Sequence, residues 1–134
     1  MNKSIRIGCA SAFWGDTNAA AAQLVEKGNI NYLVFDYLAE ITMSILAAKR
    51  MKDPNDGYAT DFVDHVMVPL MAQIKAKNIR VVVNGGGVHP VACQKALEDA
   101  AGKTGVSFRV AVVLGHDLLP PDKKFVGLTR PASG

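Results

Sequence analysis

The 134-residue sequence lacks the long apolar run that a membrane-spanning helix needs. It contains no stretch of about eighteen or more apolar residues. The first residues, Met1-Asn2-Lys3-Ser4, lead straight into a β-branched stretch and not into the apolar core of a signal peptide. We therefore expect a soluble, cytoplasmic protein without a membrane partner.

Cysteine is also scarce, which argues against a disulfide scaffold. The two cysteines, Cys9 and Cys93, fall inside segments that we interpret as a strand and a helix. Such thiols suit a reduced cytosol. No H-x-x-x-H or C-x-x-C spacing occurs, so we predict no metal site, and no motif calls for a cofactor.

The basic residues form no continuous stripe. The net charge is +3, and the densest basic groups are residues 49–52 and Lys123-Lys124. A nucleic-acid surface would need such residues clustered and interleaved with aromatic side chains. We expect a small-molecule ligand and no nucleic-acid partner.

Apolar patterning predicts alternating strands and helices. The expected strands are 5–10, 32–36, 79–83 and 107–113, and the expected helices are 17–27, 39–51, 58–77 and 89–101. Asp16 is the expected N-cap of the first helix, and Gly102 is the expected end of the last. Pro69 lies inside the third helix, where its missing N–H predicts a kink.

This order predicts an α/β fold with a mostly parallel sheet. We expect a three-layer sandwich, Rossmann-like or flavodoxin-like, with the strand order 2-1-3-4. Residues 1–119 would form the domain and residues 120–134 a tail, which contains enough apolar residues to dock. Four strands leave two open edges, so we expect the tail, a second copy or another subunit to cover them.

One stretch has the layout of a ligand site in such a sheet. An apolar strand is followed by Asn84, by Gly85-Gly86-Gly87, and by His89 at the start of a helix. Glycines let backbone N–H groups approach a ligand, and a helix N-terminus favours an anion. The alternative is a tight turn without a ligand. No Gly-Lys-Ser/Thr follows, so this is not a P-loop.

The carboxyl ends of parallel strands bring other polar loops to the same edge. The first loop carries Ser11, Phe13, Trp14 and Asp16. Ser11 could bind a ligand, but it lacks the setting of a hydrolase nucleophile. Phe13 and Trp14 could form the wall of an apolar pocket, or Trp14 could simply pack over the sheet.

Four further residues complete the predicted site. Asp36 and Glu40 follow the second strand and could act as an acid/base pair or hold a cation, although a helix-capping acid and a solvated acid would look the same. His116 and Asp117 follow the fourth strand and, with His89, could supply a proton-transfer pair or two metal ligands, although no metal-binding spacing supports the second. We thus expect Asp36, His116 and Asp117 to be catalytic and the other residues named above, His89 included, to bind the ligand.

Three segments resemble the acyclic terpene utilisation AtuA family. They are Ile7-Gly8-Cys9-Ala10-Ser11-Ala12-Phe13-Trp14-Gly15-Asp16, residues 32–46, and Lys52-Asp53-Pro54 with the following Gly57-Tyr58-Ala59 and Asp61-Phe62-Val63. The resemblance covers about residues 5–118. The sequence differs from the family pattern at Gly85, His89 and His116.

The resemblance implies a link to the catabolism of acyclic terpenes such as citronellol and geraniol, which proceeds through acyl-CoA thioesters. Two hypotheses follow. The chain is an enzyme or part of an enzyme that handles an acyl-CoA or organic acid, or it is a non-catalytic binding or assembly module that needs a partner to complete its site.

Overall fold

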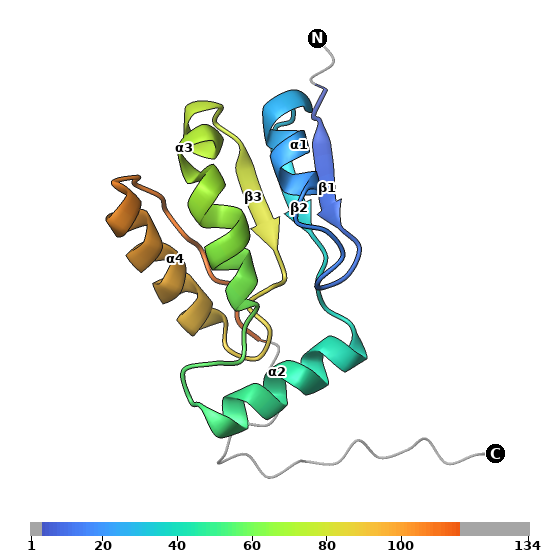
Figure 1. Ribbon diagram of the computed structural model, residues 1–134, viewed down its shortest axis with the longest axis vertical. Coiled ribbons are helices and arrows are strands. Elements are labelled where there is room, and N and C mark those ends of the chain that lie inside the picture. The colour runs from blue at the N-terminus through green and yellow to red at the C-terminus, as the bar shows by residue number, and fades with distance from the viewer. Residues whose placement is uncertain (1–3, 116–134) are drawn as a thin grey trace, which may run out of the picture.

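The computed structural model describes residues 4–115 of the chain (Figure 1). His116, Asp117 and the predicted boundary between domain and tail lie outside this part. The elements, in chain order, are β1 Ile7–Ser11, α1 Ala20–Lys27, β2 Tyr32–Phe35, α2 Glu40–Lys52, the π-helix η1 Phe62–Met67, α3 Val68–Ala76, β3 Arg80–Val83 and α4 Pro90–Thr104. The α/β class is therefore confirmed.

The three strands form a parallel sheet in the order β1-β2-β3. The predicted order 2-1-3-4 is wrong, because β2 and not β1 occupies the centre. A right-handed crossover can step in either direction along a sheet, so the sequence pattern does not distinguish the two orders. Here both crossovers step the same way, and no reversal point separates β1 from β3.

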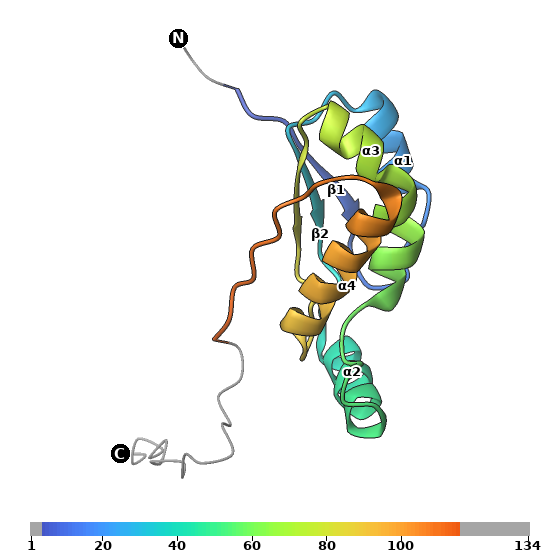
Figure 2. The same cartoon turned by 90° about the vertical axis from the view of Figure 1, so that its left-hand side faces the viewer.

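The direction of these crossovers also sets the layers. Because each crossover is right-handed and continues in one direction, the helices fall on one face of the sheet. Figure 2 shows α1, α3 and α4 together on that side. Their core includes the fully buried side chains of Val25, Leu33, Phe62, Met71 and Ile74. Within residues 4–115 the fold has two layers, so the predicted three-layer sandwich is wrong for this part.

The opposite face of the sheet is open. Ile7 on β1 is 65% exposed and Val82 on β3 is 53% exposed. Cys9 is exposed on the same side of β1, and Tyr32 and Val34 of β2 are half-buried. Parallel sheets are normally covered on both faces.

The predicted fourth strand is extended but unpaired. Residues 106–115 have no regular secondary structure, although half-buried and exposed positions alternate from Val106 to Val113. Val106, Phe108 and Val110 pack against the core, and the Gln94 side chain of α4 donates to the Val110 carbonyl. Residues 106–113 have the alternating pattern of a strand, but they do not form the hydrogen-bond ladder that defines one. The strand prediction is therefore wrong.

Pro69 changes the helix that precedes it. The predicted single helix is a π-helix up to Met67 that continues as α3 from Val68. Pro69 has no N–H to donate to the carbonyl of His65, so the hydrogen-bond ladder of an α-helix is interrupted at this position. The irregularity appears as a change of helix type at the expected place.

Two predicted helix ends are also wrong. Helix α1 begins at Ala20, and Asp16 instead accepts a 3.0 Å hydrogen bond from Ala12 N–H within the preceding loop. Helix α4 continues past Gly102 to Thr104, and Gly105 ends it with a left-handed φ of 70°. In residues 4–115 no helix is long and apolar enough to cross a membrane.

Candidate functional site

The carboxyl ends of the three strands are joined by direct hydrogen bonds. Asp36 N–H donates to the Ser11 carbonyl at 3.4 Å. The Asn84 amide group donates to the Asp36 carboxylate at 2.7 Å, and its oxygen accepts from Tyr37 N–H at 2.7 Å. Asn84 thus uses both ends of its side chain to hold the loop after β2 against the loop after β3. The predicted site residues Ser11, Asp36 and Asn84 are brought together.

A β-bulge places Ser11. The pairing of β1 with β2 shifts between Cys9 and Ser11, so that one extra residue, Ala10, enters the strand. The strict alternation of side chains is broken there, and Ala10 and Ser11 are both buried. Ser11 is 5% exposed, and its hydroxyl has no hydrogen-bond partner in residues 4–115.

The glycine turn is held tightly by its own chain. A Cβ on Gly86 would lie 2.8 Å from Pro90, and Gly87 has a left-handed φ of 55° with Gly57 O only 2.5 Å from its Cβ position. A Cβ on Gly85 would lie 3.0 Å from Val83 and 3.1 Å from Tyr37, and the Gly85 carbonyl accepts from Ala59 N–H. Each glycine therefore has a packing reason, which favours the tight-turn alternative over close approach to a ligand.

His89 contacts the loop after α2. Its pKa is lowered, first by burial and then by the nearby Arg50 guanidinium, while a hydrogen bond with the Pro54 backbone raises it. Arg50 also donates to the Val88 carbonyl. These contacts place His89 between the glycine turn and residues 53–57, away from the Asp36–Asn84 pair.

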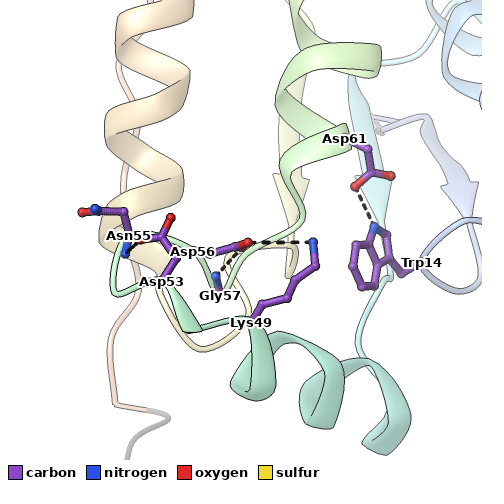
Figure 3. Close-up of polar contacts among 7 residues, drawn as sticks. All are labelled: Trp14, Lys49, Asp53, Asn55, Asp56, Gly57 and Asp61. Carbon is purple, nitrogen blue, oxygen red and sulfur yellow. Dashed lines mark hydrogen bonds and ion pairs between the residues drawn. The ribbon is translucent and has the colours of Figure 1, made fainter. Parts of the chain in front are cut away.

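The half-buried charges of the chain gather around Trp14. Among the lysines and arginines of residues 4–115, Lys49 alone is not exposed, and among the acids only Asp56 and Asp61 are not. Trp14 Nε1 donates to Asp61 at 2.7 Å, the Lys49 ammonium lies 5.5 Å from the centroid of the Trp14 ring, and Lys49 Nζ is 3.9 Å from Asp56. Figure 3 shows this arrangement above α2. Charged groups resist burial, so their gathering marks this place as the candidate site.

Several elements build this cluster. Trp14 comes from the loop after β1, Lys49 from α2, and Asp56 and Asp61 from the segment between α2 and η1. Helix α2 lies beyond the carboxyl ends of the strands (Figure 1), and its Lys49 lies over Trp14 of the loop after β1 (Figure 3). The cluster thus sits between α2 and the sheet.

Tyr37 links the two parts of the site. Its backbone is held by Asn84, and its ring packs against Phe35 and Phe62 with centroids 5.6 and 6.1 Å apart. Burial, and then the negative charge of Asp61, raises the pKa of Tyr37 to about 12. The phenol is therefore a neutral hydrogen-bond donor at physiological pH.

The remaining predicted residues are dispersed. Phe13 is 56% exposed, and Asp16 and Glu40 are exposed at the loop and at the start of α2. Sequence reasoning missed Lys49, Asp56, Asp61 and Tyr37. The only signal for Asp61 was its place in one of the segments that resemble the family.

Two surface hollows lie elsewhere. One lies between η1 and α4 and is lined by Tyr58, Val63 and Lys103 among others, and one lies at the amino end of the sheet beside Arg80. Neither is lined by a residue of the predicted site. In the part of the chain that is described, no three His, Cys, Asp or Glu side chains are grouped to hold a metal ion.

These observations define an α/β protein with an open parallel sheet and a polar site between its carboxyl edge and a crossing helix. The model of the family described as acyclic terpene utilisation family protein AtuA matches residues 5–128. The chain belongs to this family, and the resemblance seen in the sequence is confirmed. Comparisons with curated proteins and with solved structures found no match.

Proposed function

We propose that this protein binds an acyl-CoA or a related organic acid of acyclic terpene catabolism at the carboxyl edge of its sheet, as an enzyme or as part of one. The family supplies the link to terpene utilisation. The ligand class, and a role for Asp36 in proton transfer, are our inference from the site. His116 and Asp117 remain proposed partners of Asp36 that follow the described residues.

The observation that carries this proposal is the hydrogen-bonded junction of the three loops. Asp36 is exposed, yet its carboxylate is oriented by a 2.7 Å bond from Asn84. An acid that is fixed in place but open to solvent can exchange a proton with a bound ligand. Trp14 and Phe13, in the neighbouring loop, supply aromatic surface for an apolar chain.

Isothermal calorimetry with geranyl-CoA, acetyl-CoA and free CoA tests the ligand class. We expect geranyl-CoA to bind more tightly than acetyl-CoA, because only its chain can cover the aromatic surface. Absence of heat from all three at millimolar concentration would refute the proposal. Asp36→Asn, which keeps the size of the side chain, should leave binding within about threefold and abolish any turnover that depends on proton transfer.

A second candidate function rests on a different observation, the open face of the sheet. A parallel sheet with exposed Ile7 and Val82, whose two edge strands pair with no further strand within residues 4–115, is suited to association with another chain. On this view the protein is an assembly module, and a second copy or another subunit completes its site.

Light scattering over a range of concentrations tests the second candidate. Self-association should weaken in Ile7→Lys and Val82→Lys, while Ile41→Lys, which changes an equally exposed residue on α2, should leave it unchanged. A strictly monomeric protein at high concentration would remove self-association from consideration.

A further inference from the structure

Lys49 differs from every other lysine and arginine in the described part of the chain. It alone is half-buried, with 39% of its side chain exposed. Its ammonium lies over the Trp14 ring at 5.5 Å. A lysine that loses part of its hydration normally recovers it through hydrogen bonds.

Lys49 makes no such bond within residues 4–115. Its nearest acid, Asp56, is 3.9 Å away, which is an ion-pair distance and too long for a hydrogen bond. The other oxygen of Asp56 already accepts from Gly57 N–H at 2.6 Å. Lys77 provides the contrast, because its ammonium donates to the carbonyls of Val25 and Glu26 at 2.6 and 3.0 Å. Lys49 therefore keeps donors for another acceptor.

The charges around Lys49 restrict which chemical group can be that acceptor. Asp56 and Asp61 are the two half-buried acids of the same cluster (Figure 3). With one cation and two acids, the cluster has no excess positive charge to hold a phosphate. A carbonyl oxygen, or a singly charged carboxylate, needs only one donor and suits this balance better.

The Trp14 ring beside Lys49 restricts the chemical character of the rest of the ligand. Trp14 is fixed by its bond to Asp61, so its indole is held ready as a rigid apolar surface. Phe13, the preceding residue, is 56% exposed and adds aromatic surface to the same loop. An oxygen at Lys49 would thus belong to a molecule whose apolar chain follows these rings.

We propose that Lys49 donates the hydrogen bond that holds the acyl oxygen of the ligand, a carbonyl or carboxylate, with the apolar chain lying on Trp14. This inference rests on the proposed function and adds to it the residue that recognises the reacting end. Asp61 acts through Trp14 as a positioning residue.

The single tryptophan makes the test direct, because its fluorescence reports on this place alone. The full chain is titrated with sodium geranate, geranyl-CoA and free CoA, and Trp14 emission and calorimetry are recorded together. We compare Lys49→Gln and Lys49→Arg with Lys52→Gln, a matched control at the exposed last residue of the same helix. Circular dichroism establishes that each variant is folded.

We expect geranate and geranyl-CoA to change Trp14 emission in the wild type. Lys49→Gln should weaken both by at least about tenfold, whereas Lys49→Arg and Lys52→Gln should stay within about threefold. Any weak binding of free CoA should be the same in all variants. If folded Lys49→Gln binds the acyl ligands as well as the wild type, the role of Lys49 is refuted while the proposed function stands. If the wild type binds neither acyl ligand, both the role of Lys49 and the proposed function are refuted.

Discussion

Trp14 Nε1 donates a 2.7 Å hydrogen bond to the carboxylate of Asp61, which lies 47 positions later in the chain. This bond joins the loop after β1 to the turn before η1. Trp14 and Asp61 both lie in segments that resemble the AtuA family. The hydrogen bond between them gives the two segments a shared structural role, because it fixes the indole beside Lys49.

Removal of the Asp61 carboxylate should loosen Trp14. We expect Asp61→Ala to lower the free energy of unfolding by about 2 kcal/mol, because a half-buried indole N–H loses a charged acceptor. Asp61→Asn keeps an acceptor oxygen and should cost about 1 kcal/mol or less. Urea unfolding measures the loss, and Trp14 emission should shift to the red. Asp64→Asn, at an exposed position in the same segment, is the control; unchanged emission in Asp61→Ala would contradict the bond.

The two hydrogen bonds of Asn84 should be worth more than an ordinary surface contact. Asn84→Ala removes the link to Tyr37 N–H and the support of Asp36, and we expect a loss of about 1–3 kcal/mol in the free energy of unfolding. Asn18→Ala, on an exposed loop, should change it by less than about 0.5 kcal/mol. Equal stability of the two variants would show that the loops do not need Asn84.

Substitution of glycine by alanine should have opposite effects on stability at Gly87 and at Gly102. Gly87→Ala should destabilise the protein by about 2 kcal/mol or more, because φ is positive and the new methyl group would meet Leu46 and Gly57. Gly102→Ala lies inside α4 with open space around it and should stabilise the protein by about 0.5–1 kcal/mol. Thermal unfolding distinguishes them, and a neutral Gly87→Ala would contradict the packing of the glycine turn.

The buried phenol of Tyr37 should make stability depend on pH above 10. Its pKa is raised from 10.0 to about 12, so the folded protein holds this proton more tightly than the unfolded chain does. The stabilisation is fully present below pH 10 and is lost as the pH rises through about 12, with an upper limit of about 2–3 kcal/mol. Urea unfolding across this range should show a smaller decline in Tyr37→Phe than in the wild type.

Asp61 gives an independent check of the same phenol. Its charge is the second cause of the raised pKa, so Asp61→Asn should shift the ultraviolet titration of Tyr37 to lower pH. A Tyr37 titration centred near pH 10, obtained by subtracting the Tyr37→Phe curve from that of the wild type, would contradict the burial of this hydroxyl.

The sequence predicted the elements better than their arrangement. Helices and strands up to residue 104 were predicted within a few residues, because apolar periodicity and glycine turns act locally. The strand order was wrong, since pairing depends on contacts between distant segments. Residues 107–113 have the alternation of a strand, yet no ladder forms on β3.

The candidate site shows the same limit. Asp36 and Asn84 were predicted because they follow strands directly, and the structure joins them. In the sequence, Lys49 stands out only as a member of the dense basic group at residues 49–52. It is half-buried only because α2 crosses the ends of the strands, and a helical pattern does not specify where a helix will lie. Burial of a charge is a property of the assembled fold and has no local signature.

The one-directional winding of the sheet has a consequence for how such a chain can grow. Because β2 is central and both edges are unpaired within residues 4–115, a strand added beyond β3 or beside β1 would leave the existing neighbours in place. The junction of Ser11, Asp36 and Asn84 would survive such an addition unchanged. The three strands and the hydrogen-bonded loops at their carboxyl ends can therefore stay unchanged within a larger sheet.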